Sequence, residues 1–212
     1  MAHEFQLFTG KPVNIEQYWP GTFWYDQASC IMVHSSNWGY DFYTPDMYSN
    51  GTETNTAPGF FQQGQTPEDE DVTDGALAFC LLPPVESLLK NLNGNDIIID
   101  GEEEDLDLTH HWHKTELVLP NKQLERFECI FATSYRDGVP DWLEYTTDNR
   151  YTIVYEHATK RFLIIGHDYA RNKPTIEDVT KRVIAWRALP VPGRILQLLN
   201  YQPKPSPDGL PF

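Results

Sequence analysis

The segment from residue 115 to residue 165 is a succession of short apolar stretches separated by turn signals, and this feature most limits the possible fold. Within it, residues 125–135 alternate between apolar and polar side chains, as expected for a strand with two different faces. Asp137-Gly138 then gives a strong hairpin signal. Because such short connections leave no room for crossover helices, the strands must pair antiparallel. The pattern predicts strands over 115–119, 125–135, 142–146, 151–155 and 162–165.

The pattern changes after Pro174. Apolar residues then recur at helical spacing, and Glu177 and Asp178 are suited to a first helical turn, so we expect a C-terminal α-helix over 175–188. Shorter helices are expected over 84–90 and 193–201. In the N-terminal half, aromatic and β-branched residues predict strands over 22–33, 38–43 and 60–63. The chain is therefore expected to be mostly β, in a barrel or a sandwich.

The chain has 212 residues and a mass of 24.5 kDa, and 40% of its residues are hydrophobic, which suits one folded domain spanning 1–212. Its net charge is −15, so it should repel nucleic acids and anionic membranes. Eleven of its 31 acidic residues fall within 68–74 and 100–107. We interpret 66–110 as an acidic insertion with solvated loops, and 203–212 as an extended Pro-rich tail.

Targeting and covalent features give few further limits. No apolar run is long enough to span a bilayer, and the first residues do not have the pattern of a signal peptide. The localisation therefore stays open, and the sequon at Asn50 matters only in a secreted protein. Cys30, Cys80 and Cys129 show no metal-binding or redox spacing, and we expect three buried thiols rather than a disulfide.

Two stretches resemble the lipocalin family. Near the start, Gly21-Thr22-Phe23-Trp24 follows a short helical turn, as in the family's G-x-W motif before its first strand. Near the other end, Thr147-Asp148-Asn149-Arg150-Tyr151 is similar to the family's T-D-x-x-Y stretch at a strand turn. The strand pair after it and a following helix match the family's closing order.

This resemblance implies a lipocalin-like (calycin) antiparallel β-barrel with a C-terminal helix. Such a barrel encloses a cavity for one small molecule. Members of the family mostly bind small apolar or amphipathic molecules, and a minority isomerise or cyclise them without a redox cofactor. The resemblance also implies that Trp24 is buried at the closed end of the barrel, near His167 or Arg171.

The most conspicuous local group of chemically active residues is 110–113, with three histidines and a tryptophan. On a strand, His111 and His113 would face the same side, with Glu116 nearby. That set offers three interpretations: metal ligation, a polar strand start, or proton donors and acceptors in a cavity. The spacing does not match a cupin, and we predict no metal and no cofactor. We expect His111, His113 and Tyr135 to be the catalytic groups.

Aromatic residues on the expected strands can serve as core, as cavity lining, or as both. The predicted ligand contacts are Phe127, Phe131, Trp142, Tyr151 and Tyr155. Signatures of serine hydrolases, P-loop proteins and dinucleotide-binding proteins are absent. We therefore expect a hydrophobic small-molecule partner and a cofactor-independent isomerisation or cyclisation. The alternatives are a carrier of such a ligand and an acidic protein that binds or inhibits another protein.

Overall fold

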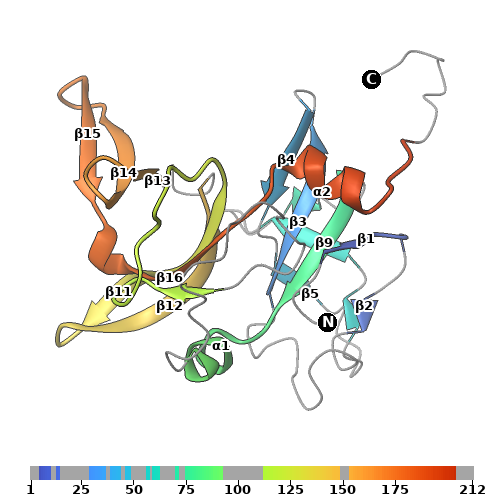
Figure 1. Cartoon of the computed structure of the whole chain (residues 1–212), viewed down its shortest axis with the longest axis horizontal. Helices are drawn as coiled ribbons and strands as arrows, with labels where there is room; N and C mark the ends of the chain where they lie inside the picture. Colours follow the sequence, from blue (N-terminus) through green and yellow to red (C-terminus); the bar gives the residue numbers. More distant parts are fainter. Residues whose placement is uncertain are drawn as a thin grey trace.

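A computed structural model describes residues 5–10, 13–14, 29–36, 39–43, 46–48, 56–57, 59–62, 70–71, 75–92, 112–148 and 153–203. Within these ranges the chain is mostly β, and every strand pairing is antiparallel (Figure 1). The coarse prediction of an antiparallel β protein is therefore confirmed. None of the described helices is long and apolar enough to cross a membrane.

The N-terminal sheet consists of seven of the described strands. Its order is β1-β9-β3-β5-β7-β8, and β4 also pairs with β3. Its longest strands, β3 and β9, bury the side chains of residues 30–33 and 78–82. The bounds are β1 Gln6–Leu7, β3 Ser29–Ser36, β4 Gly39–Tyr43, β5 Asp46–Tyr48, β7 Gly59–Gln62, β8 Glu70–Asp71 and β9 Ala76–Leu82; a separate pair joins β2 (Val13–Asn14) to β6 (Thr56–Ala57).

Two further sheets come from the second half of the chain. The central sheet has the order β10-β16-β11-β12, and the outer sheet has the order β13-β14-β15. Their strands are β10 His113–Lys114, β11 Phe127–Arg136, β12 Val139–Thr147, β13 Ile153–Glu156, β14 Arg161–Asp168, β15 Lys173–Asp178 and β16 Val183–Ala188. The helices are α1 (Val85–Asn91) and α2 (Pro192–Leu198), and the 3-10 turn η4 (Thr180–Arg182) precedes β16.

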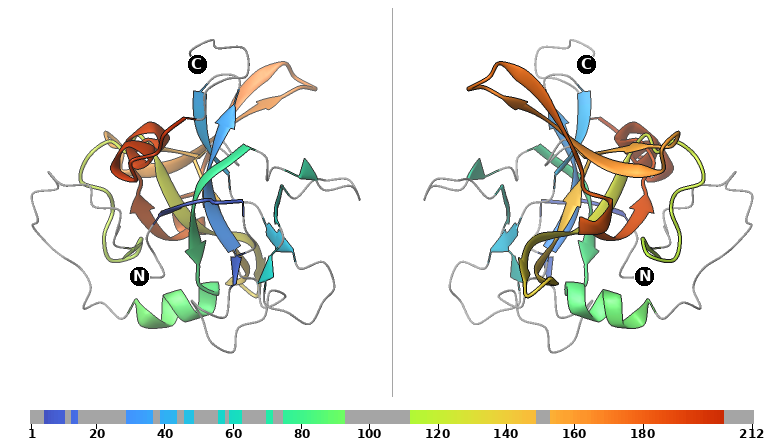
Figure 2. Two further views of the ribbon diagram at one scale, coloured as in Figure 1. Left: turned by 90° about the vertical axis from the view of Figure 1, so that its right-hand side faces the viewer. Right: turned by 90° about the vertical axis from the view of Figure 1, so that its left-hand side faces the viewer.

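The central sheet contributes side chains to a core on each of its faces. One face contributes Ile130, Tyr145 and Ala185 to a core shared with the N-terminal sheet and both helices. The other face contributes Phe127 and Phe131, among others, to a second core shared with the outer sheet. The layers are therefore N-terminal sheet, central sheet and outer sheet, and the β14–β15 hairpin projects from the end of the molecule opposite α1 (Figures 1 and 2).

Several local predictions are confirmed. The alternation over 125–135 corresponds to β11, and Asp137 and Gly138 form its turn to β12 with φ angles of 52° and 79°. Positive φ at both positions is the type I′ geometry that this dipeptide favours. The short helices expected over 84–90 and 193–201 correspond to α1 and α2. All three cysteines are buried free thiols.

The predicted helix over 175–188 is wrong, because this segment forms β15, η4 and β16. β16 is buried on both faces, so its apolar residues form a continuous run instead of an alternating one. Such a run cannot be distinguished from a buried helix by periodicity. A register shift between Ile130 and Phe131, where β11 pairs with β16, further breaks the period of two.

The predicted strand over 115–119 is also wrong. After β10 the chain turns, and the N–H groups of Leu117 and Val118 both donate to the carbonyl oxygen of Lys114, at 3.0 and 2.9 Å. Leu117 is exposed as a result. An alternating pattern of five residues was too short to outweigh these local hydrogen bonds.

The described strands form separate stacked sheets and do not close into one barrel, so that part of the predicted architecture is not borne out. The motif residues Gly21, Thr22, Phe23 and Trp24 lie outside the described residues, as do Asn149, Arg150 and Tyr151. His167 and Arg171, the expected neighbours of Trp24, are exposed. Most of 66–110 and nearly all of the tail likewise lie outside the described ranges.

Candidate binding site

A cleft of about 440 Å³ lies where α1, the turn after β10, and η4 approach one another. This volume falls within the ~300–1,000 Å³ range of small-molecule sites. Apolar and polar side chains share its lining: Leu89, Leu119, Val183 and Ile184 on the one hand, and Lys114, Thr115, Glu116, Thr180 and Lys181 on the other. The cleft therefore suits a molecule with an apolar body and a polar group.

Hydrogen bonds fix the first wall of the cleft. The Thr115 N–H donates to the Ile184 carbonyl at 3.0 Å, which continues the pairing of β10 with β16. Behind the turn, Trp186 Nε1 donates to the Val118 carbonyl at 2.9 Å. The wall is thus held by backbone geometry before any ligand arrives, which reduces the entropy cost of binding.

The opposite wall is held equally well. Arg182 N–H donates to the Val179 carbonyl at 2.8 Å, and Thr180 Oγ1 accepts from the Phe162 N–H at 3.0 Å. Tyr135 Oη donates to the Lys181 carbonyl at 3.1 Å. The position of Lys181 in the cleft is therefore set by contacts with both the outer sheet and β11.

Three polar groups of the cleft have unused capacity. Lys114 and Lys181 form no ion pair with any residue that the structure describes. Thr115 Oγ1 is buried, and it has no hydrogen-bond partner within the described part of the chain. Buried hydroxyls are nearly always satisfied, so this one is an exception among the described residues.

The predicted catalytic residues do not converge on one point. The His113 ring stacks on Trp186, with the ring centroids 4.6 Å apart. Trp186 of β16 is the register partner of His113 on one side and of Cys129 on the other. Tyr135 lies further along β11 than Cys129, and the rise per residue of a strand puts the two roughly 20 Å apart. The Tyr135 hydroxyl donates a hydrogen bond to the Lys181 carbonyl. His111 lies outside the described residues.

The predicted ligand contacts are divided between core and surface. Phe127, Phe131 and Tyr155 are fully buried in the core between the central and outer sheets. Tyr155 Oη donates to the Pro120 carbonyl at 2.8 Å, which fixes the ring in place. Trp142 is 55% exposed on β12, and Tyr151 is not among the described residues. Three of the five predicted ligand contacts therefore lie together, but they pack in the core and do not line the cleft.

The lysines of the cleft were not foreseen from the sequence. Lys114 follows the histidine group directly, and Lys181 lies in the segment predicted to be helical. Single lysines are usual on surfaces, so neither one stood out. The one feature that could have drawn attention to them is the small number of basic residues, because the chain has 16 Lys and Arg residues and 31 acidic ones.

A second polar cluster lies inside the core. Glu128 and Arg187 are direct cross-strand partners on β11 and β16, both side chains are 0% exposed, and Arg187 Nη2 lies 2.5 Å from Glu128 Oε2. The Arg187 guanidinium also lies over the Trp112 ring, 5.0 Å from its centroid. Burial raises the pKa of the Glu128 carboxyl above its ordinary value, against the opposing effect of Arg187.

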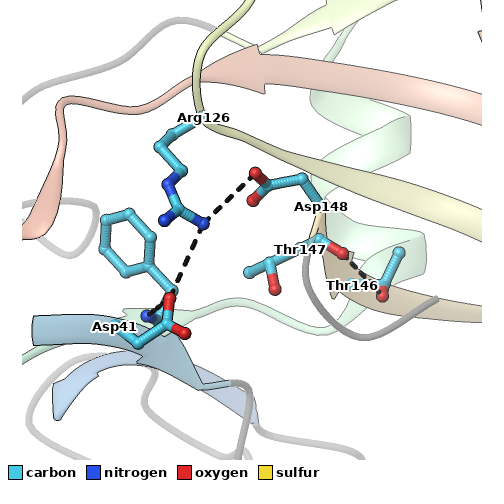
Figure 3. Close-up of polar contacts among 6 residues, drawn as sticks. Asp41, Arg126, Thr146, Thr147 and Asp148 are labelled. Carbon is cyan, nitrogen blue, oxygen red and sulfur yellow. Dashed lines mark hydrogen bonds and ion pairs between the residues drawn. The ribbon is translucent and has the colours of Figure 1, made fainter. Parts of the chain in front are cut away.

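A third cluster joins the N-terminal and central sheets. Arg126 Nη1 lies 3.4 Å from Asp148 Oδ2 and 3.6 Å from Asp41 Oδ1 of β4 (Figure 3). Loss of solvent raises the pKa of Asp148 to about 6, although Arg126 acts in the opposite direction. No three His, Cys, Asp or Glu side chains among the described residues gather as metal ligands.

Comparison of the chain with models of known families, with curated proteins and with solved structures finds no match.

Proposed function

We propose that this protein binds a small molecule with a large apolar part in the cleft between α1, the turn after β10, and η4. The observation that carries the proposal is a preformed cleft of about 440 Å³ whose lining combines apolar side chains with polar ones. Apolar surface with a few placed polar groups is the usual form of such sites. This is the ligand class that the lipocalin resemblance implies, and the proposal does not require a closed barrel.

Catalysis on the bound molecule stays a prediction. The expected reaction is a cofactor-independent isomerisation or cyclisation, with His111, His113 and Tyr135 as proton donors or acceptors. The separation of His113 from Tyr135 along the sheet makes a binding or carrier role the better supported one. Replacement of His113 by Ala and of Tyr135 by Phe, with turnover and affinity both measured, distinguishes the two roles.

Binding is tested with N-phenyl-1-naphthylamine, an uncharged apolar dye whose fluorescence rises when it leaves water. The wild-type protein is expected to bind one dye molecule, because the cleft offers apolar walls on both sides. Leu89→Trp should weaken this binding at least ten-fold, because the larger side chain of α1 occupies the cleft.

The matched control is Leu198→Trp, the same change on α2 at a position that is exposed and outside the cleft lining. It should bind the dye as the wild type does. Circular dichroism establishes that both variants are folded. Absence of dye binding to the wild type, or equal binding by Leu89→Trp, contradicts the proposal.

A further inference from the structure

The charges around the cleft bear on the kind of molecule that fits. Lys114 extends from the first wall, at the end of β10, and Lys181 from the opposite wall, in η4. Their ammonium groups form no ion pair with a residue that the structure describes. The lining of the cleft thus includes two cationic side chains, although the chain has a net charge of −15.

Among the described residues, Glu116 is the only acidic one in the lining, and it is exposed. It forms no ion pair with either lysine, so it does not neutralise them. The local sum is two positive charges and one negative charge. Asp178 of β15 also interacts electrostatically with Lys181, but it does not line the cleft, where the positive charges are in excess and favour an anion.

We infer that the ligand is an amphipathic organic anion, with an apolar body between the cleft walls and a single anionic group between Lys114 and Lys181. The inference rests on the proposed binding function and adds the chemical class. Lysine acts here as a point charge and does not require a particular anion geometry.

The experiment compares two dyes that differ by one anionic group. The dye 8-anilinonaphthalene-1-sulfonate has the same apolar body as N-phenyl-1-naphthylamine and carries a sulfonate in addition. The wild type is expected to bind the sulfonate at least five-fold more tightly than the neutral dye. Binding that remains in Leu89→Trp measures attachment outside the cleft and is subtracted.

Variants of the charged residues then locate the effect. Lys114→Met and Lys181→Met keep the length of the side chain and remove its charge. Each should weaken binding of the sulfonate about five-fold and the double variant about twenty-fold, with the neutral dye unchanged. Glu116→Gln should strengthen sulfonate binding two- to three-fold. Lys173→Met, an exposed change on β15 outside the lining, is the control and should change neither dye.

The outcomes separate the two proposals. Equal binding of both dyes, unaffected by the lysine variants, overturns the anion and leaves the binding function standing. Weaker sulfonate binding in Glu116→Gln also overturns it, because the carboxylate would then be supporting the binding of an anion that it should repel. If the neutral dye does not bind, or if Leu89→Trp does not block it, the binding function fails and the anion with it.

Discussion

Arg126 and Glu128 lie two residues apart in the chain, and each forms an ion pair where the central sheet meets the N-terminal sheet. Glu128 and its partner Arg187 are 0% exposed, whereas the side chains of Arg126, Asp148 and Asp41 are 29, 13 and 40% exposed. Both pairs join an arginine to a carboxylate, so the property that distinguishes them is their exposure to solvent. Water reduces the interaction in the exposed cluster and reduces the cost of losing it as well.

The inner pair also leaves polar atoms unsatisfied. Glu128 Oε1, Arg187 Nη1 and Trp112 Nε1 are buried and have no hydrogen-bond partner within the described part of the chain. Two charges have thus been removed from water with incomplete compensation, a situation in which an ion pair contributes little net stability. Removing only one partner is a different matter, because the remaining charge then has neither water nor a counter-ion.

The largest expected effect is therefore that of Arg187→Met. It leaves the Glu128 carboxylate buried and unpaired, and it should lower the free energy of unfolding by about 3–5 kcal/mol. The double variant Glu128→Leu, Arg187→Met should recover most of this loss, because apolar side chains suit this layer of the core. Urea denaturation of both single variants and of the double variant gives the coupling energy.

If Arg187→Met does not fold, Glu128→Gln tests the same point with a smaller change, since it keeps the shape and removes the charge. A loss below about 1 kcal/mol in both single variants would mean that the pair is solvated in solution and that the contrast with the Arg126 cluster is wrong.

Strands β11 and β16 show which parts of this arrangement the sequence could predict. The alternation of β11 and its Asp137-Gly138 turn are local signals, and both were predicted correctly. The partner of Glu128 lies 59 residues away on a strand whose two-sided burial imitates a helix. No local pattern specifies that pairing.

The cleft was beyond prediction for the same reason. Lys114 and Lys181 line the same cleft because β10 pairs with β16 and η4 precedes β16, whereas the sequence pattern had predicted a helix in place of η4 and β16. The histidine group at 110–113 was the most conspicuous candidate in the sequence, and residues 110 and 111 lie outside the described residues. Its described member His113, however, stacks on Trp186 instead of lining the cleft.

A smaller effect is expected at Asp148, and it depends on pH. Its pKa of about 6 in the folded protein lies above the ordinary value of 3.8. The folded state therefore holds this proton more tightly than the unfolded state does. The resulting stability is fully present below about pH 3.8 and is lost as the pH rises through about 6.

Asp148→Asn removes this titration and keeps the shape of the side chain. Relative to this variant, the wild type should lose on the order of 1 kcal/mol between pH 4 and pH 7.5, a figure reduced for the solvent that reaches the site. Urea denaturation of both proteins at several pH values measures the difference. A difference that is constant with pH, or one that changes in the opposite direction, would show that Arg126 dominates and that the carboxyl is ionised throughout.

The smallest effect is expected for Asp41→Asn. Asp41 Oδ1 lies 3.6 Å from Arg126 and also accepts from the Phe42 N–H at 2.9 Å, a hydrogen bond that an asparagine can keep. The change therefore removes the charge of a half-exposed ion pair, and it should cost about 0.5 kcal/mol or less at low salt. At 1 M NaCl the screening length falls to about 3 Å, and the cost should disappear.

The coupling energy of Glu128 with Arg187 should stay the same at both salt concentrations, because ions in solution do not reach a pair that is fully buried. Parallel urea titrations of Asp41→Asn and of the Glu128–Arg187 set, at low salt and at 1 M NaCl, make the comparison directly. If salt changed both clusters equally, solvent would reach both, and exposure could not be the property that distinguishes them.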